Sequence, residues 1–447
     1  MSAGALLRWL APPALLAAAA ACGPGQEPPG RPVQTAVPFS EGQLRRIMQM
    51  SPLPPLPTDT TNRYADDPLA ARFGQALFFD ERLSADGAVS CATCHDPDQG
   101  FTDGKQLALG QAVGNRHTPT LWNVAHHRWL TWDGRADSLW MQALDPIEDP
   151  REMGTTRGKL ARVIADDPGL LAAYSAVFGP IKSAALRDRP DDVRPPRGRE
   201  ATSGSTAPEA VRAWGALSDD QRAAIDEVFV HAGKAMAAYQ RLLVRGDAPF
   251  DRFVEGLRED DAEKVESLSP GAQRGLAMFI GKANCVLCHS GPNFSDGEFH
   301  NNALPTLHGG EARDPGRFDG AKVVAASPFN AAGPHSDNPG GPAALRVRQL
   351  RQSSEAWGEF RTPSLRNLAH RAPFMHQGQF RGLEDVIEFY SELEGATGRG
   401  HHQEQVLAPL RLSKAEKEDL RAFLDALEGA QADPSLLVPL SHSALGR

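Results

Sequence analysis

Two short segments of this chain combine two cysteines and a histidine at a spacing that can do chemistry: Cys91-Ala-Thr-Cys94-His95 and Cys285-Val-Leu-Cys288-His289. This Cys-x-x-Cys-His spacing is that of covalent haem attachment. Both thiols of a motif bond to the vinyl groups of one haem, and the histidine binds its iron. A zinc site would need four ligands close together, whereas the two motifs are far apart and no further cysteine lies near either. The sequence therefore predicts two c-type haems, with His95 and His289 as iron ligands.

The remaining cysteine, Cys22, ends an apolar, alanine-rich segment that follows Arg8. Such a segment predicts a secretory signal over residues 1–22 and is too short for a good membrane span. A run of small residues ending in cysteine is also typical of a bacterial lipoprotein signal. A lipid anchor at Cys22 and ordinary cleavage near Ala21 are therefore both open. Because c-type haem is attached outside the cytoplasm, we expect the protein in the periplasm or on the outer surface of a bacterial envelope.

The length of 447 residues allows about two to three domains. We expect a flexible Pro/Gly-rich tether over 23–57, a first haem domain over 58–210 that ends in a linker rich in Pro, Arg and Ser, a second over 211–430, and a tail over 431–447. The net charge of −9 argues against a nucleic-acid partner and against an anionic membrane surface. It would suit a basic electron-transfer partner.

Local sequence signals predict where the helices around these motifs begin. Ser413 with Glu416 forms a capping box, Ser269 precedes a proline at a first helical position, and Ser218 opens a long apolar-periodic segment. No run of alternating residues predicts strands. The stretch 305–346 is irregular and too long for a simple turn. We predict an all-α fold of two cytochrome c-like helical domains, each with one covalent haem, and long loops around the cofactors.

Three further segments stand out: Arg116-His117-Thr118-Pro119-Thr120, Thr131-Trp132-Asp133-Gly134-Arg135-Ala136 and Phe360-Arg361-Thr362-Pro363-Ser364-Leu365-Arg366-Asn367. With them, the chain resembles the bacterial di-haem cytochrome c peroxidase and MauG family over roughly Leu69 to Leu427. Segments 138–144 and 314–318 resemble the MbnH-like branch, which oxidises a partner protein. The resemblance implies an enzyme that uses hydrogen peroxide to form high-valent iron and oxidises an exported protein by long-range electron transfer. A conventional peroxidase with a small redox protein as donor, and a non-catalytic electron carrier, are the alternatives.

Within this resemblance, the position of the histidine that caps the first iron in conventional members is occupied by Gln111. The first haem is therefore expected to keep an open site for peroxide. His117, His126 and His127 are nearby candidates for a replacement ligand.

The resemblance also places four residues around that open site: Trp132, Gln142, Pro146 and Glu152. A buried carboxyl group beside the iron can move the peroxide proton, and burial is expected to raise its pKa toward that task. Glu152 could otherwise be an exposed acid in a charged cluster. Trp132 is expected between the haems, where it would relay oxidising equivalents.

For the second haem the resemblance places Tyr390 where conventional members have a methionine. A phenolate favours oxidised iron, whereas a thioether favours ferrous iron. Met375 is the rival ligand, and Tyr390 could instead be a core aromatic of an amphipathic helix. The family's calcium site between the haems is uncertain in this chain, because His117 stands at its asparagine position and Arg371 at its threonine position, although Pro373 is retained.

Overall fold

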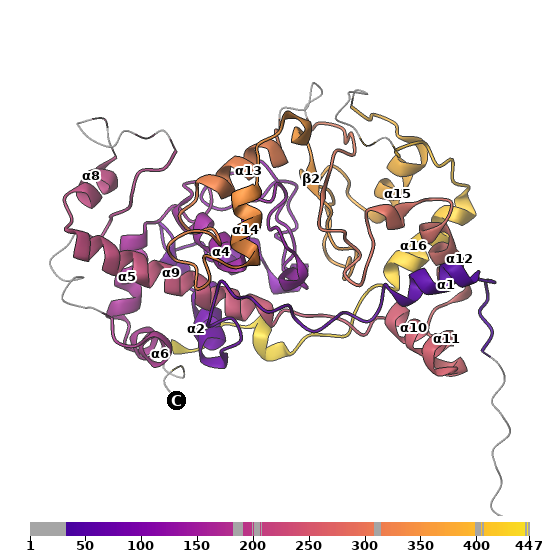
Figure 1. The fold of residues 1–447 in the computed structure, drawn as a ribbon, viewed down its shortest axis with the longest axis horizontal. Coiled ribbons are helices and arrows are strands. Elements are labelled where there is room, and N and C mark those ends of the chain that lie inside the picture. Colours follow the sequence, from indigo (N-terminus) through magenta and orange to yellow (C-terminus); the bar gives the residue numbers. More distant parts are fainter. Residues whose placement is uncertain are drawn as a thin grey trace, which may run out of the picture.

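The computed structural model describes residues 33–181, 191–198, 200, 206, 208–307, 314–397, 404, 406–442 and 445. In this part of the chain nearly all regular structure is helical, which confirms the predicted all-α fold (Figure 1). The one sheet is a pair of antiparallel two-residue strands, β1 (Phe299–His300) and β2 (Phe360–Arg361). The helices are α1 (Glu41–Met48), α2 (Pro68–Phe78), α3 (Cys91–Cys94), α4 (Leu139–Glu148), α5 (Arg157–Asp166), α6 (Pro168–Phe178), α8 (Glu209–Gly215), α9 (Asp219–Arg241), α10 (Pro249–Glu259), α11 (Ala262–Glu266), α12 (Pro270–Ile280), α13 (Arg317–Ala326), α14 (Pro342–Gln349), α15 (Leu383–Glu392) and α16 (Lys414–Asp425).

The helix starts that the sequence indicates are confirmed. Ser218 caps α9 and Ser269 caps α12, each by accepting a hydrogen bond from a backbone N–H in the first turn. The Ser413 hydroxyl accepts from the backbone N–H of Glu416, whose carboxylate accepts from the backbone N–H of Ser413. These contacts satisfy donors that a helix otherwise leaves unpaired at its N-terminus.

Each half of the molecule packs the helix before its cysteine motif against a later helix, α2 against α9 and α12 against α16 (Figure 1). A glycine allows the close approach in both halves. A Cβ on Gly74 would lie 2.0 Å from the carbonyl oxygen of Ala235, and one on Gly275 would lie 2.0 Å from that of Asp419. The first core contains fully buried side chains from both of its helices, including Phe73, Leu77, Phe78, Ile225, Val228, Phe229 and Met236. The second contains Phe250, Phe253, Leu276, Phe279, Phe294 and Phe423.

This packing differs from the predicted domain boundary at 210/211. The helix α9 lies beyond that boundary and yet belongs to the first core, as do Val324 of α13 and Val347 of α14. The predicted tail also packs on the first half, where the Tyr239 hydroxyl donates to the carbonyl of Leu436 at 2.6 Å. The first half is therefore assembled from three separate stretches of chain.

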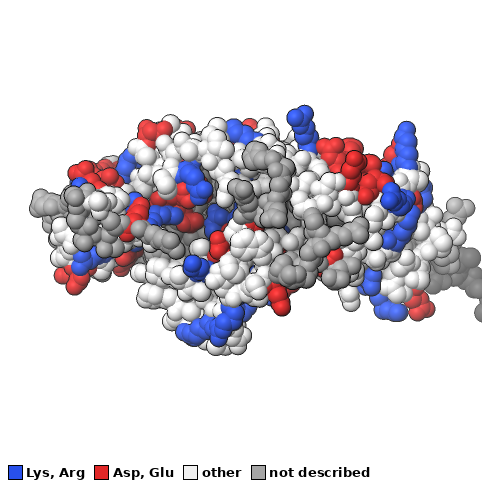
Figure 2. Space-filling model, turned by 90° about the horizontal axis from the view of Figure 1, so that it is seen from above, with Lys and Arg blue, Asp and Glu red and all other residues white. Residues whose placement is uncertain are grey.

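The expected tether is wrong for residues 33–57. The helix α1 packs on α12, Ile47 and Met50 are buried in the second core, and Arg46 donates to the carbonyl of Ile280 at 3.1 Å. The predicted signal with Cys22, and most of the predicted linker, lie outside the described residues. None of the helices in the described part of the chain is both long and apolar enough to cross a membrane. Figure 2 shows basic and acidic side chains interspersed over one face of the molecule, so the net negative charge is not gathered there.

Candidate haem sites and the junction between them

The first motif forms a single helical turn, α3, with the backbone N–H of Ser90 held by the Thr93 hydroxyl at 2.9 Å. One turn brings Cys91 and Cys94 to the same side of the backbone. The second motif forms a 3₁₀ turn over Cys285–Leu287. All four cysteines are free thiols in the structure. Each motif therefore presents two thiols together, as attachment to one haem requires.

The two motif histidines have matching environments. The Nδ1 atom of His95 lies 3.0 Å from the carbonyl oxygen of Phe101, and that of His289 lies 3.0 Å from the carbonyl oxygen of Phe294. Burial lowers the pKa of both rings, which favours the neutral form. A neutral ring that donates from Nδ1 keeps the lone pair on Nε2 for a metal. Both histidines are therefore suited to be axial iron ligands.

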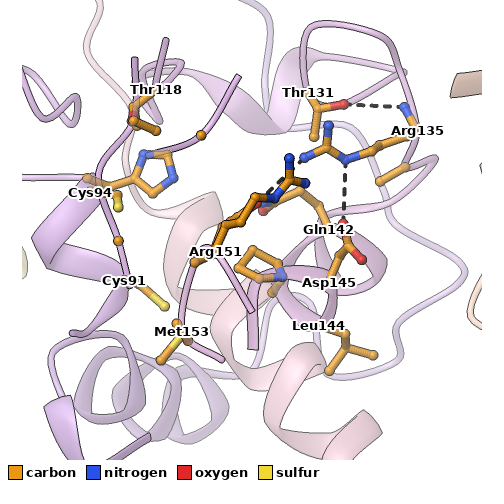
Figure 3. Close-up of a pocket in the computed structure, with 18 of the residues that line it drawn as sticks. Cys91, Cys94, Thr118, Thr131, Arg135, Gln142, Leu144, Asp145, Arg151 and Met153 are labelled. Atoms are coloured by element: carbon orange, nitrogen blue, oxygen red, sulfur yellow. Dashed lines mark hydrogen bonds and ion pairs between the residues drawn. The ribbon is translucent and has the colours of Figure 1, made fainter. Parts of the chain in front are cut away.

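A cavity lies against the first motif, and the four residues expected around the open site all line it: Trp132, Gln142, Pro146 and Glu152. Figure 3 shows Cys91 and Cys94 on one side of this cavity and Arg135, Gln142 and Asp145 on the other. The helix α4 supplies most of this opposite wall. The structure thus brings together residues that the sequence separates by a whole helix.

Glu152 has the electrostatics of a proton carrier. Burial raises the pKa of its carboxyl group to about 7 despite the nearby Arg135 guanidinium. Arg135 lies 3.9 Å from the Glu152 carboxylate and 3.5 Å from that of Asp145. A group with a pKa near neutral can both accept and return a proton. The alternative of a fully exposed acid in a charged cluster does not describe this side chain.

Gln111 does not line the cavity, and its side-chain amide donates to the Asp86 carboxylate at 2.6 Å. The three candidate replacement ligands lie in different places. The His117 ring lines the cavity, but its Nδ1 lies 2.8 Å from the carbonyl oxygen of Lys105 and the ring has a second backbone hydrogen bond with Arg371. Two backbone groups therefore hold the His117 ring, as two backbone groups hold each motif histidine.

His126 and His127 are not among the cavity-lining residues. His126 Nε2 is buried without a partner, and His127 Nδ1 lies 2.9 Å from the Arg361 guanidinium. Of the three candidate replacement ligands, only His117 therefore lines the cavity.

The two halves repeat a short backbone bridge followed by a helix, α4 in the first half and α15 in the second. Counted from the N-cap residues Ser138 and Gly382, Pro146 and Tyr390 occupy the same helical position. Because Pro146 lines the first cavity, this register directs Tyr390 toward the second haem site. This shared register can be recognised in the sequence only when the two helices are aligned on their N-cap residues.

The surroundings of Tyr390 agree with that placement. Its hydroxyl accepts a hydrogen bond from Asn302 at 3.1 Å. Burial and the neighbouring Cys285 raise its pKa, so the hydroxyl lies beside the second motif. Met375 has a left-handed backbone, with φ of 74°, in a tight loop whose carbonyl accepts from Gly378. The position of Tyr390 supports it over Met375 as the ligand.

The halves meet at Trp132. Its indole N–H donates to the carbonyl of His117 at 2.8 Å, and its ring lies 6.5 Å from that of His376. Two backbone bonds cross the junction symmetrically: His117 donates to the His376 carbonyl, and Arg361 donates to the Trp132 carbonyl, each at 2.8 Å. Sequence reasoning missed His376 and Arg361. The repeated Thr-Pro-x-Leu-x-Asn segments at 118–123 and 362–367 are the signal that could have found them.

Comparisons with known proteins match this architecture. The family model for di-haem cytochrome c peroxidase matches residues 68–259. The methylamine utilization protein MauG of Methylorubrum extorquens is 32% identical over 367 residues, which cover 82% of this chain and 80% of MauG. Cytochrome-c peroxidase IdrP1 of Pseudomonas sp. (strain SCT) is 30% identical over 404 residues, 88% of this chain and 87% of the relative. The crystal structure of a MauG-like protein associated with microbial copper homeostasis superposes with a TM-score of 0.54 at 25% identity, covering 88% of this chain and 97% of that one.

Proposed function

Because this chain belongs to the di-haem cytochrome c peroxidase family, we propose that it works in the manner of MauG on an exported partner protein. The chain is a di-haem enzyme that acts on peroxide, with a partner protein or redox donor as its second substrate. In the proposed reaction, oxidising equivalents from hydrogen peroxide pass to the partner by long-range electron transfer. The observation that carries this proposal is the half-buried Tyr390 beside the second motif.

The residues that would hold the cofactors are those of the two motifs. Cys91 and Cys94 would form thioethers to one haem and His95 would bind its iron, and Cys285, Cys288 and His289 would do the same for the other. When bound, haem supplies an iron that coordinates peroxide and accepts electrons. The chain's own contribution is to position protons, charges and an electron path around it.

Glu152 would take the proton from peroxide and return it to the departing oxygen. Its pKa of about 7 allows both steps at neutral pH. Arg135, at 3.9 Å, would stabilise the carboxylate while it is ionised. The amide of Gln142 on the same wall can orient the incoming molecule. Trp132, between the halves, would carry oxidising equivalents from one side of the junction to the other.

Tyr390 would set the role of the second site. A phenolic oxygen is an anionic donor that favours oxidised over reduced iron, so a site with this ligand is poorly suited to deliver electrons from a small cytochrome. It is better suited to share an oxidising equivalent until a slow macromolecular donor arrives. Contact with the partner would be at the surface over the second half.

The test compares the parent with Tyr390→Met after addition of peroxide. Stopped-flow spectra of the parent should show an oxidised species that outlives the peroxide, and Tyr390→Met should lose it while retaining both haems. An unchanged species in the variant would refute the proposal. Mass spectrometry of proteins encoded beside this one, with and without the enzyme, would identify the partner.

The second candidate is a conventional peroxidase, which the similarity to IdrP1 favours. Steady-state turnover with a small reduced cytochrome at about 10 per second or faster would support it.

A further inference from the structure

Two guanidinium groups at the junction, those of the buried Arg361 and the half-buried Arg371, have no carboxylate partner among the described residues. Arg361 is 6% exposed and donates only to neutral groups: the Thr131 carbonyl at 3.3 Å, the Thr362 carbonyl at 3.1 Å and the His127 ring. Arg371 donates from one nitrogen to three backbone carbonyls, those of Arg366 at 2.8 Å, Asn367 at 3.4 Å and Ser364 at 3.5 Å.

Such an arrangement lacks charge balance. Removing a cation from water is costly unless an anion accompanies it, and carbonyl dipoles compensate only in part. Desolvation lowers the pKa of both Arg361 and Arg371 to about 10, and the charge of Arg371 adds to this effect at Arg361; both groups are still protonated at neutral pH. Glu428 is the acid whose charge raises the pKa of Arg371, and it is itself paired with Arg245 at 2.8 Å. We therefore expect a bound anion to balance the charge of the two guanidinium groups.

The location of the two guanidinium groups indicates which anion. The Arg371 side chain packs against the loop that follows the first motif. A Cβ on Gly100 in this loop would lie 2.9 Å from that side chain. The backbone of Arg371 has a hydrogen bond with the ring of His117, which lines the first cavity. Arg361 is in the strand that precedes Pro363, whose backbone has a hydrogen bond with the ring of His289. Arg371 is thus joined to the wall of the first cavity, and Arg361 lies two residues before the proline that contacts the second motif histidine.

We propose that Arg371, together with Arg361, binds haem carboxylates at the junction and takes the place of a divalent cation there. Each haem carries two carboxylate groups, and a guanidinium fork is shaped to bind carboxylate. The inference rests on haem binding at both motifs and is independent of which partner is oxidised.

The calcium ion that the family resemblance implies does not fit these residues. His117 stands at the position of a carboxamide ligand, and its imidazole offers no oxygen to a calcium ion; its ring has hydrogen bonds with two backbone groups. One of those groups belongs to Arg371, whose backbone carbonyl was the expected second ligand. The Arg371 side chain adds a fixed positive charge that repels a cation. A protein cation in place of a metal ion would make the junction insensitive to chelators.

The experiment compares the purified holoprotein with Arg371→Gln, which removes the charge, and Arg371→Lys, which keeps it. Arg274→Gln is the matched control, because Arg274 is an exposed arginine paired with Asp419 on the surface. The readout is the midpoint potential of each haem by spectroelectrochemistry. A nearby positive charge stabilises the reduced haem, so Arg371→Gln should lower at least one potential. Arg371→Lys should restore it, and Arg274→Gln should match the parent.

Metal analysis of the parent provides the second, independent measurement. After dialysis against EGTA the holoprotein should contain no stoichiometric calcium, and its absorption spectrum should be unchanged. One retained calcium per chain, a spectrum that EGTA alters, or parental potentials in Arg371→Gln would each overturn the proposal. If Arg371→Gln does not accumulate with haem, the calcium content of the parent still decides. Loss of the proposed partner oxidation would leave all of these readouts unchanged.

Discussion

Replacing Glu152 with glutamine removes one ionisable group from the first cavity while preserving its shape and hydrogen-bonding capacity. In the parent the pKa of Glu152 is about 7, because its half-buried position disfavours the charged form. The form that accepts the peroxide proton is the carboxylate. The rate constant for the reaction with peroxide should therefore rise with pH through about 7 and then level off. Glutamine cannot take the proton, so the rate constant should fall by about 10²- to 10⁴-fold and the inflection near pH 7 should disappear.

Stopped-flow mixing with peroxide at several pH values measures both quantities. Asp149→Asn is the matched control, because Asp149 is in the same loop and its carboxylate pairs with Arg151 at 3.2 Å. This variant should keep an inflection, moved to lower pH because the charge of Asp149 raises the pKa of Glu152.

A stability measurement separates lost chemistry from lost folding. The folded-state pKa of Glu152 lies above the value of an unfolded glutamate, so the fold favours the protonated group. That contribution to stability is fully present at low pH and is lost as the pH rises through about 7. Above pH 7 the Glu152→Gln variant should therefore unfold at a temperature no lower than that of the parent. A variant that keeps the parental rate constant and its inflection near pH 7 would refute the assignment of Glu152 as the proton carrier.

Three further predictions concern the haems and the packing. Intact mass of the mature protein should exceed the polypeptide by two haem masses, and replacement of both motif cysteines at Cys91 and Cys94 by serine should remove one; a gain of one haem in the parent would contradict the double attachment. Tyr390→His should keep both haems but shorten the life of the oxidised species, as followed by optical spectroscopy; parental decay would leave Met375 as the better ligand. Gly74→Ala should lower the free energy of unfolding by about 1–3 kcal/mol, because the added methyl group would meet the Ala235 carbonyl at 2.0 Å; a thermal melt equal to that of the parent would show that the helices can separate without cost.

Much of the local chemistry could be predicted from the sequence, because it depends on residues close together in the chain. The Cys-x-x-Cys-His spacing acts within a single turn, and the helix caps at Ser218, Ser269 and Ser413 act within the next three residues. Family resemblance added Glu152, Gln142, Trp132 and Pro146, which the structure gathers around one cavity.

The division into halves could not be predicted, because burial decides it. Residues 33–57 have the composition of a tether, yet Ile47 and Met50 find an apolar surface on the second half, which burial of their side chains stabilises. The helix α9 likewise follows a linker in sequence, but its apolar face complements α2.

What the sequence by itself determined is therefore the attachment motifs, the helical class and the identity of the residues offered to each haem. Only the tertiary structure decided how the halves meet. It set Trp132 against His376, joined the His117 ring to two backbone groups, and placed the buried Arg361 and the half-buried Arg371 without an acidic partner among the described residues. The physical reason is that charge balance and open coordination sites depend on contacts between residues far apart in the chain, which no local spacing specifies.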